Sequence, residues 1–213
     1  MKPLASAKVA GAIASALISS SAFATSVFIN EFHYDNDGGD VDEFIEIVAP
    51  EGTDLTDYSV VLYNGNNGAA YLTETLSGTV ASLGDGMGSY VINLPTNGIQ
   101  NGAPDGLALV NSNGQLIQFL SYEGSFTAVG GAADGITSVD IGIEETASTE
   151  IGMSLQLTGE GSEYDDFTWH ANNQTPGAAN QGQTFNFTVT PFINEIHYDN
   201  DGGDINELVE IAG

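Results

Sequence analysis

The sequence predicts an all-β protein whose strands form a β-sandwich. Short apolar, β-prone runs alternate with clusters of glycine, asparagine and aspartate along the 213 residues. No window carries a sustained apolar stripe with the 3.6-residue period of a helix. Many short strands at this spacing, separated by turn residues, are typical of a sandwich. Hydrophobic residues make up 41% of the chain, which is enough to build a core.

The predicted strands are separated by short turns. The stretch 111–114 (Asn-Ser-Asn-Gly) lies between two apolar runs and predicts a hairpin. The stretch 130–150 is rich in glycine, alanine and acids, and we expect a long loop there. The runs that we predict to be strands are 27–33, 44–48, 58–63, 90–94, 107–110, 116–122, 154–157 and 185–189.

The first 24 residues have the features of a signal peptide. Lys2 and Lys8 form a short positive region, and an apolar run at 9–17 follows. Ala22-Phe23-Ala24 then matches the small-x-small pattern that signal peptidase cuts. An uncleaved membrane anchor is the alternative, but the run is well short of the roughly 20 residues that span a bilayer. We therefore expect cleavage near Ala24, an extracellular or periplasmic location, and no membrane span.

The charge of the chain is strongly negative. Lys2 and Lys8 are its only basic residues besides histidine, so their removal takes the formal charge from −27 to −29. A chain without cations cannot neutralise phosphates, and we expect no direct nucleic-acid binding by this portion. The acids either keep an exported protein soluble or hold divalent cations. No cysteine occurs, so a core or bound ions must stabilise the fold.

A 22-residue segment occurs twice. Residues 28–49 and 192–213 are identical at 15 of 22 positions. A unit of that size cannot bury its own apolar face, so we expect the second copy to be the truncated start of another module, and downstream domains to follow in a longer parent protein. The alternative is a closing strand of the first domain. The predicted organisation is a signal peptide at 1–24, a module at 25–182, a linker or closing strand at 183–191, and the second repeat at 192–213.

An acidic turn at 35–40 (Asp-Asn-Asp-Gly-Gly-Asp) recurs at 199–204. Short oxygen-bearing side chains with glycines between them suit Ca²⁺, which takes six to eight oxygen ligands. The turn is not an EF-hand, because Gly39 replaces the third acid and no helix follows. A solvated turn whose side chains accept its own backbone N–H groups is the alternative. The candidate calcium ligands are Asp35, Asp37, Asp40, Asp42 and Glu43, with Asp199, Asp201 and Asp204 in the second copy.

The sequence offers few candidates for catalysis. His33 and His197 occupy the same repeat position, and we expect each to hydrogen-bond its own turn. Glu31 and Glu46 can form a carboxylate pair across adjacent strands, as glycosidases require, but nothing in the sequence fixes their separation. No nucleophile elbow, phosphate loop or zinc-protease helix is present. We therefore predict no catalytic residue, and we expect Trp169 to belong to the core.

Several short motifs point together to one family. They lie at the start of the predicted module, in its next strand pair and in its last third. In order they are 29–31 (Ile-Asn-Glu), 33–35 (His-Tyr-Asp), 43–47 (Glu-Phe-Ile-Glu-Ile), 54–58 (Asp-Leu-Thr-Asp-Tyr), 60–64 (Val-Val-Leu-Tyr-Asn), 154–159 (Ser-Leu-Gln-Leu-Thr-Gly), 166–169 (Asp-Phe-Thr-Trp) and 175–180 (Thr-Pro-Gly-Ala-Ala-Asn).

This set of motifs resembles the lamin-tail domain of bacterial secreted proteins, over about residues 26 to 182. The resemblance implies an immunoglobulin-like β-sandwich. It is greatest to the N-terminal region of large extracellular nucleases, whose catalytic domain has no counterpart here. We therefore expect a non-catalytic accessory, binding or spacer module of an exported multidomain protein, with calcium as a possible cofactor. The alternative is the N-terminal fragment of an extracellular nuclease, a DNA or RNA phosphodiesterase.

Overall fold

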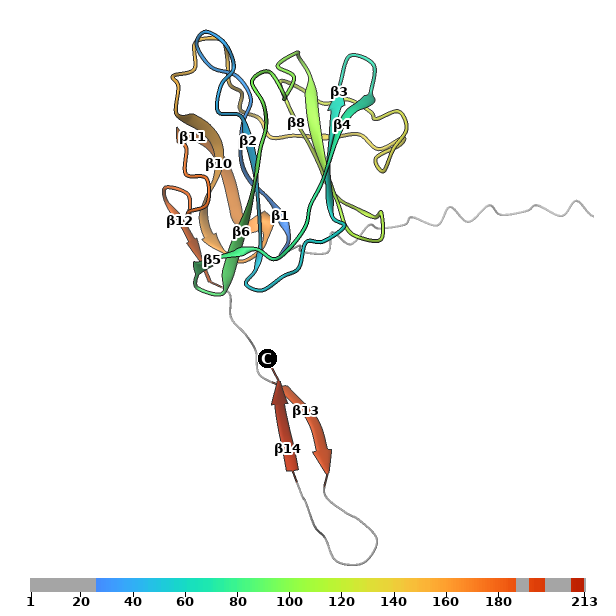
Figure 1. The fold of residues 1–213 in the computed structure, drawn as a ribbon, viewed down its shortest axis with the longest axis vertical. Coiled ribbons are helices and arrows are strands. Elements are labelled where there is room, and N and C mark those ends of the chain that lie inside the picture. Colours follow the sequence, from blue (N-terminus) through green and yellow to red (C-terminus); the bar gives the residue numbers. More distant parts are fainter. Residues whose placement is uncertain (1–25, 187–191, 198–207, 213) are drawn as a thin grey trace, which may run out of the picture.

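The computed structural model of the chain describes residues 26–186, 192–197 and 208–212. Within these ranges the protein is all-β, and the one helical segment is a 3-10 turn, η1 (Tyr164–Asp166). Two sheets face each other in a sandwich-like arrangement, which confirms the predicted class (Figure 1). The proposed signal peptide and the second acidic turn lie outside the described residues.

The first sheet has seven strands. Its order is β11-β10-β1-β2-β6-β5, and β12 pairs with the end of β10. The N-terminal hairpin, β1 and β2, therefore lies in the middle of the sheet, next to a strand from the last third of the domain. The strands are β1 (Phe28–His33), β2 (Phe44–Pro50), β5 (Ala81–Gly84), β6 (Met87–Asn93), β10 (Met153–Gly161), β11 (Phe167–Asn173) and β12 (Gln183–Phe185).

The second sheet has five strands in the order β4-β3-β7-β8-β9. A further hairpin, β13 with β14, forms a separate two-stranded sheet. The strands of the second sheet are β3 (Ser59–Asn64), β4 (Ala69–Thr75), β7 (Asp105–Val110), β8 (Leu116–Tyr122) and β9 (Val139–Asp140), and those of the hairpin are β13 (Phe192–His197) and β14 (Leu208–Ala212).

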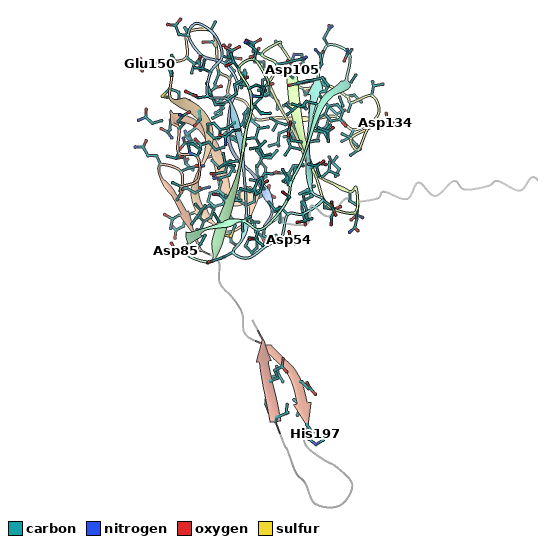
Figure 2. The ribbon with its side chains drawn as sticks, in the orientation of Figure 1. Asp54, Asp85, Asp105, Asp134, Glu150 and His197 are labelled. Carbon is teal, nitrogen blue, oxygen red and sulfur yellow. The ribbon has the colours of Figure 1, made fainter. Side chains whose placement is uncertain are left out.

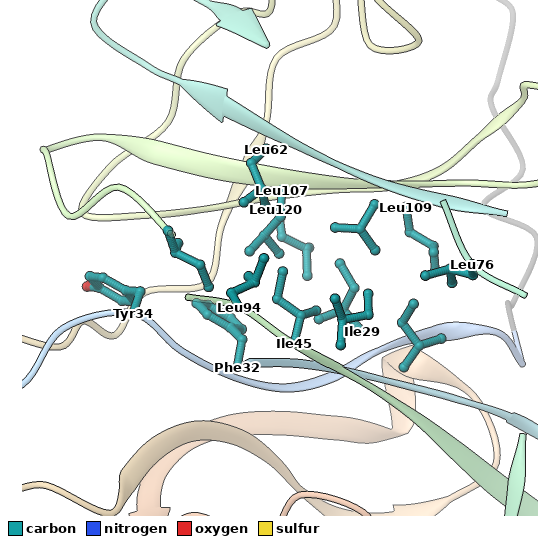
Figure 3. Close-up of a cluster of buried hydrophobic side chains, with 14 of the residues drawn as sticks. Ile29, Phe32, Tyr34, Ile45, Leu62, Leu76, Leu94, Leu107, Leu109 and Leu120 are labelled. Atoms are coloured by element: carbon teal, nitrogen blue, oxygen red, sulfur yellow. The ribbon is translucent and has the colours of Figure 1, made fainter. Parts of the chain in front are cut away.

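The main core fills the space between the two sheets (Figure 3). Ile29, Phe32 and Ile45 point from the first sheet toward the leucines of the second, and all three are fully buried. Trp169 is half-buried and meets Phe32 edge-on, with ring centroids 5.3 Å apart, so it belongs to the core rather than to an open surface. Each fully buried side chain of this size stabilises the fold by about 1.5–3 kcal/mol.

The observed strands match the predicted ones closely where the apolar signal is strong. β8 has the predicted bounds, and the turn at 111–114 joins β7 to β8 as expected. The run at 185–189 overlaps β12 only at Phe185, because 187–189 lie outside the described residues. The expected loop at 130–150 is mostly irregular, although it contains the short strand β9. Within the sandwich, the strands without a prediction are β4, β5, β9 and β11.

The outer face of β1 and β2 is buried as well. A bulge at Asn30 lets Ile29 and Phe32 both face the core, while Phe28 and Glu31 face outward. Every residue of β1 is nevertheless buried. The segment 174–183 covers this face near Glu31 and Glu46, as its hydrogen bonds to these residues show. Polar side chains in this hairpin are therefore enclosed by the fold.

Candidate cation site and buried carboxylates

The acidic turn brings two of its carboxyl groups together. Asp35 and Asp40 are both nearly buried, whereas Asp37 is exposed. Burial, together with the hydrogen bond and charge of the Asp40 carboxyl, raises the pKa of Asp35 to about 6. Since like charges at short range oppose ionisation, this pair favours either a shared proton or a cation.

A polar hollow of about 330 Å³ lies beside this pair. Its lining includes Asp40, Asn101 and Asp105. Asn101 donates its side-chain N–H to Asp40 Oδ2 at 3.2 Å. The buried carboxylate of Asp105 accepts the backbone N–H groups of Gly65 and Gly102. The hollow therefore offers carboxylate and amide oxygens, which are the ligands that Ca²⁺ prefers.

The other predicted ligands do not join Asp35 and Asp40. Asp37 and Asp42 are exposed, and Asp42 has a positive φ of 60°. Glu43 is buried and accepts the backbone N–H groups of Gly98 and Ile99 at 2.6 and 3.1 Å. Among the described residues, no three acids or histidines are close enough together to hold a metal ion. The predicted ligands Asp199, Asp201 and Asp204 lie outside the described residues.

His33 is hydrogen-bonded both to its own turn and to a loop that is distant in the sequence. Its Nε2 is 2.7 Å from Nδ2 of Asn36, and its Nδ1 is 2.8 Å from Oε1 of Glu145. Burial alone lowers the pKa of His33, but the hydrogen bond and charge of Glu145 outweigh it and raise the value. Glu145 Oε2 also accepts the backbone N–H groups of Tyr34 and Asp35. Glu145 thus holds the backbone of Tyr34 and Asp35 in place at the start of the acidic turn.

Glu31 and Glu46 are register partners on β1 and β2, and both are fully buried. Glu31 accepts hydrogen bonds from the Ser154 hydroxyl at 2.6 Å and from the backbone N–H of Thr175 at 2.7 Å. Glu46 accepts the backbone N–H of Gly177 at 2.6 Å. Burial, together with the negative charge of Glu31, raises the pKa of Glu46 to about 7.

The Glu31–Glu46 pair therefore differs from a glycosidase pair. A glycosidase needs its two carboxyl groups on either side of an open substrate cleft. Here the segment 175–177 lies over both groups, and neither side chain reaches solvent. The geometry supports a structural role, in which the two carboxyl groups attach the segment 175–177 to the sheet.

A larger, mostly apolar groove of about 680 Å³ lies away from these acids, between β8 and η1. Ile117, Phe119 and Tyr164 line it together with Gln118. The side-chain Oε1 of Gln118 accepts the backbone N–H of Ile29, and the buried Nε2 of the same side chain has no hydrogen-bond partner. No charged pair lies in this groove, so we place the candidate site at the acidic turn.

Sequence reasoning missed three residues that shape the site. These residues are Glu145, Asn101 and Asp105. Asn101 is 61 residues from its partner Asp40, and Glu145 is 110 residues from its partner Asp35. No local pattern distinguishes them from the other acids and amides of the chain. These residues reach the turn only when the two sheets pack together in the folded domain.

Comparisons with protein-family models, curated proteins and solved structures found no match. The resemblance to the lamin-tail domain therefore stays a prediction from the motifs. In the described part of the chain, no helix has the length and apolar character needed to cross a membrane.

Proposed function

We propose that the domain formed by residues 26–186 is a non-catalytic accessory module of an exported multidomain protein, and that it binds Ca²⁺ beside its acidic turn. The observation that carries the proposal is the contact between the carboxyl groups of Asp35 and Asp40, of which Asp40 lines a polar hollow.

The electrostatics of this contact favour a bound cation. Two unit charges about 4 Å apart repel each other by about 1–4 kcal/mol at effective dielectric constants between those of water and a protein surface. The chain has no Lys or Arg after Lys8, so no basic side chain of these two types is available to balance them. Asn101 and the hollow next to Asp40 supply further oxygens. The buried Oδ1 of Asn36, in the same turn, has no hydrogen-bond partner.

The buried ionisable groups support a structural role rather than catalysis. Glu31, Glu46, His33 and Glu145 each have specific hydrogen-bond partners, and all four are buried. Each carboxylate among them accepts backbone N–H groups of a neighbouring segment. A substrate can reach them only if those segments move away.

Calorimetric titration of the full chain with Ca²⁺, with Mg²⁺ as a competitor, tests the cation site. We expect a saturable heat and a rise in melting temperature with Ca²⁺. Asp40→Asn should lose both, whereas Asp85→Asn, at an exposed turn between β5 and β6, should keep both. An absence of heat and of any melting shift in the unmodified chain would rule out the calcium part of the proposal.

A separate assay tests the non-catalytic part. The purified chain, incubated with DNA or RNA in Ca²⁺ and Mg²⁺, should leave the nucleic acid intact. Hydrolysis that copurifies with the chain and follows its variants would contradict an accessory role.

A further inference from the structure

The apolar groove between β8 and η1 has one wall from each of the two sheets. β8 belongs to the second sheet, whereas η1 joins β10 to β11 of the first. Ile117 on β8 and Tyr164 on η1 are half-buried, pack against the main core and line the groove. The groove is therefore an opening at the side of the sandwich. Its volume of about 680 Å³ lies in the range of small-molecule sites.

Gln118 lines this groove and carries a polar group that the fold leaves without a partner. Its Oε1 accepts the backbone N–H of Ile29 on β1 at 2.8 Å. Because an N–H group needs an acceptor, this bond fixes which end of the amide faces β1. The Nε2 is the other end, and it is buried without a hydrogen-bond partner among the described residues. A buried donor in this state costs free energy that a bound acceptor recovers.

The aromatic wall of the groove is held in place by neighbouring rings. The hydroxyl oxygen of Tyr164 accepts the indole N–H of Trp169 at 3.0 Å. The Tyr164 ring also meets Phe28 edge-on, with ring centroids 6.0 Å apart. Because these contacts already fix Tyr164, a flat ring that packs against it loses little side-chain entropy on binding.

The charges around the groove select against ions. Asp165 lines the groove and is exposed, so it repels an anion. The chain has no Lys or Arg after Lys8 that could pair with an anion. A cation would be attracted by Asp165, but it brings hydrogen-bond donors, and Oε1 of Gln118 is already occupied. An uncharged molecule with an acceptor is the kind of ligand that suits both residues.

We propose that this groove binds a small uncharged molecule that has a flat apolar body and a carbonyl oxygen, and that Nε2 of Gln118 donates a hydrogen bond to this oxygen. The apolar body covers Ile117 and packs against the ring of Tyr164. The site is separate from the proposed cation site at the acidic turn, and it requires no calcium. It gives the module a second ligand of a different chemical class.

Three naphthalene compounds of similar shape test the proposal, in NMR titrations of the isotope-labelled full chain. Methyl naphthyl ketone has the carbonyl oxygen, ethylnaphthalene lacks it, and naphthoate carries a negative charge in its place. We expect the ketone to shift the signals of residues 115–120 and 164–165, including the side-chain amide of Gln118. Ethylnaphthalene should bind about tenfold more weakly, which corresponds to about 1.4 kcal/mol, and naphthoate should bind more weakly than the ketone.

The same titrations can overturn the proposal. Equal affinities of the ketone and ethylnaphthalene would exclude the hydrogen bond from Gln118. Unchanged signals of residues 115–120 and 164–165 at the highest soluble ketone concentration would exclude the site. Shifts confined to β13 and β14, where Ile193 is 60% exposed, would do the same, because the probe would then bind that hairpin instead.

A pair of variants locates the site on the protein. Ile117→Asp places a charge in the apolar wall, and we expect it to weaken ketone binding at least tenfold. Ile136→Asp places the same charge at a 47% exposed side chain outside the groove, and it should keep the affinity of the unmodified chain. If Ile117→Asp folds and binds the ketone as tightly as Ile136→Asp does, the groove is not the site. If thermal unfolding shows that Ile117→Asp does not fold, the comparison of ketone and ethylnaphthalene on the unmodified chain decides.

Discussion

Gly177 donates its backbone N–H to Glu46 at 2.6 Å, across 131 residues of sequence. Two residues earlier, Thr175 binds the neighbouring carboxylate of Glu31 through both its backbone and its hydroxyl group. The pair of buried acids thus holds one segment against the outer face of the first sheet. Glu31 and Glu46 are therefore buried in a position where they attach this segment to the sheet.

Stability should fall as the pH rises from about 4.5 to about 7. Burial raises the pKa of Glu46 from 4.5 to about 7, so the folded state binds a proton more tightly than the unfolded state does. The resulting stabilisation is complete below pH 4.5 and is lost as the pH rises through about 7, and it amounts to about 3 kcal/mol. Urea unfolding at pH 5 and pH 8 measures it. Glu46→Gln should flatten this dependence, and the exposed Glu150→Gln should not. An equal slope in Glu46→Gln would contradict the assignment.

Thr175→Ala should weaken the attachment of the covering segment. The substitution removes the hydroxyl donor that lies 2.9 Å from Glu31 Oε2, and it keeps the backbone donor. Hydrogen bonds to charged groups contribute about 1.5–3 kcal/mol each, and we expect a loss of this size in the free energy of unfolding. Thr96→Ala, at an exposed turn, serves as the control. If both variants unfold at the same urea concentration, the hydroxyl contributes nothing.

Glu145→Ala should be the most damaging of the acidic substitutions. It removes the partner of His33 and leaves the backbone N–H groups of Tyr34 and Asp35 without an acceptor. Breaking a buried pair in this way costs about 3–5 kcal/mol. Thermal unfolding should show a large decrease in melting temperature. Glu144→Ala, at the exposed neighbouring position, should leave it nearly unchanged, and similar melting of the two variants would argue against the role of Glu145.

Two glycine substitutions should have opposite outcomes. A Cβ at Gly65 would lie 2.0 Å from the Pro104 carbonyl oxygen, so Gly65→Ala forces the backbone apart. We expect it to destabilise the domain by about 1–3 kcal/mol or more. A Cβ at Gly39 meets nothing within 4 Å, and Gly39→Ala should stay within about 0.5 kcal/mol of the unmodified chain. Chemical denaturation of the two variants checks both values.

The sequence predicted the strands that carry strong apolar runs, such as β1, β2 and β8. It missed β4 and β11, whose residues alternate between half-buried and exposed and include polar side chains such as Thr73 and Asn172. Strands of this kind are specified by the neighbours they pair with, and a local pattern does not reveal those neighbours.

The candidate site was predicted only in part, for the same reason. The acidic turn was visible as a string of residues, and the link from His33 to its turn was expected from their spacing. The sequence gives no sign that Asp37 and Asp42 stay exposed while Asp35 and Asp40 meet. The turn conformation decides this, together with the approach of Asn101 and Glu145 from other segments.

The surface charges are distributed differently from the buried ones. Figure 2 shows Asp54, Asp85, Asp134 and Glu150 at widely separated places around the sandwich. All four are exposed. Exposed charges of one sign keep a protein soluble, although their mutual repulsion destabilises the compact state.

The central place of β1–β2 in its sheet also determines when the domain can fold. Its neighbour β10 and its cover at residues 174–183 come more than 100 residues later in the chain. Contacts of such high sequence separation form slowly, so β1 lacks its neighbour β10 until most of the domain has been synthesised, although β6 can pair with β2 earlier. The complete first sheet therefore assembles only after almost all of the domain has been synthesised.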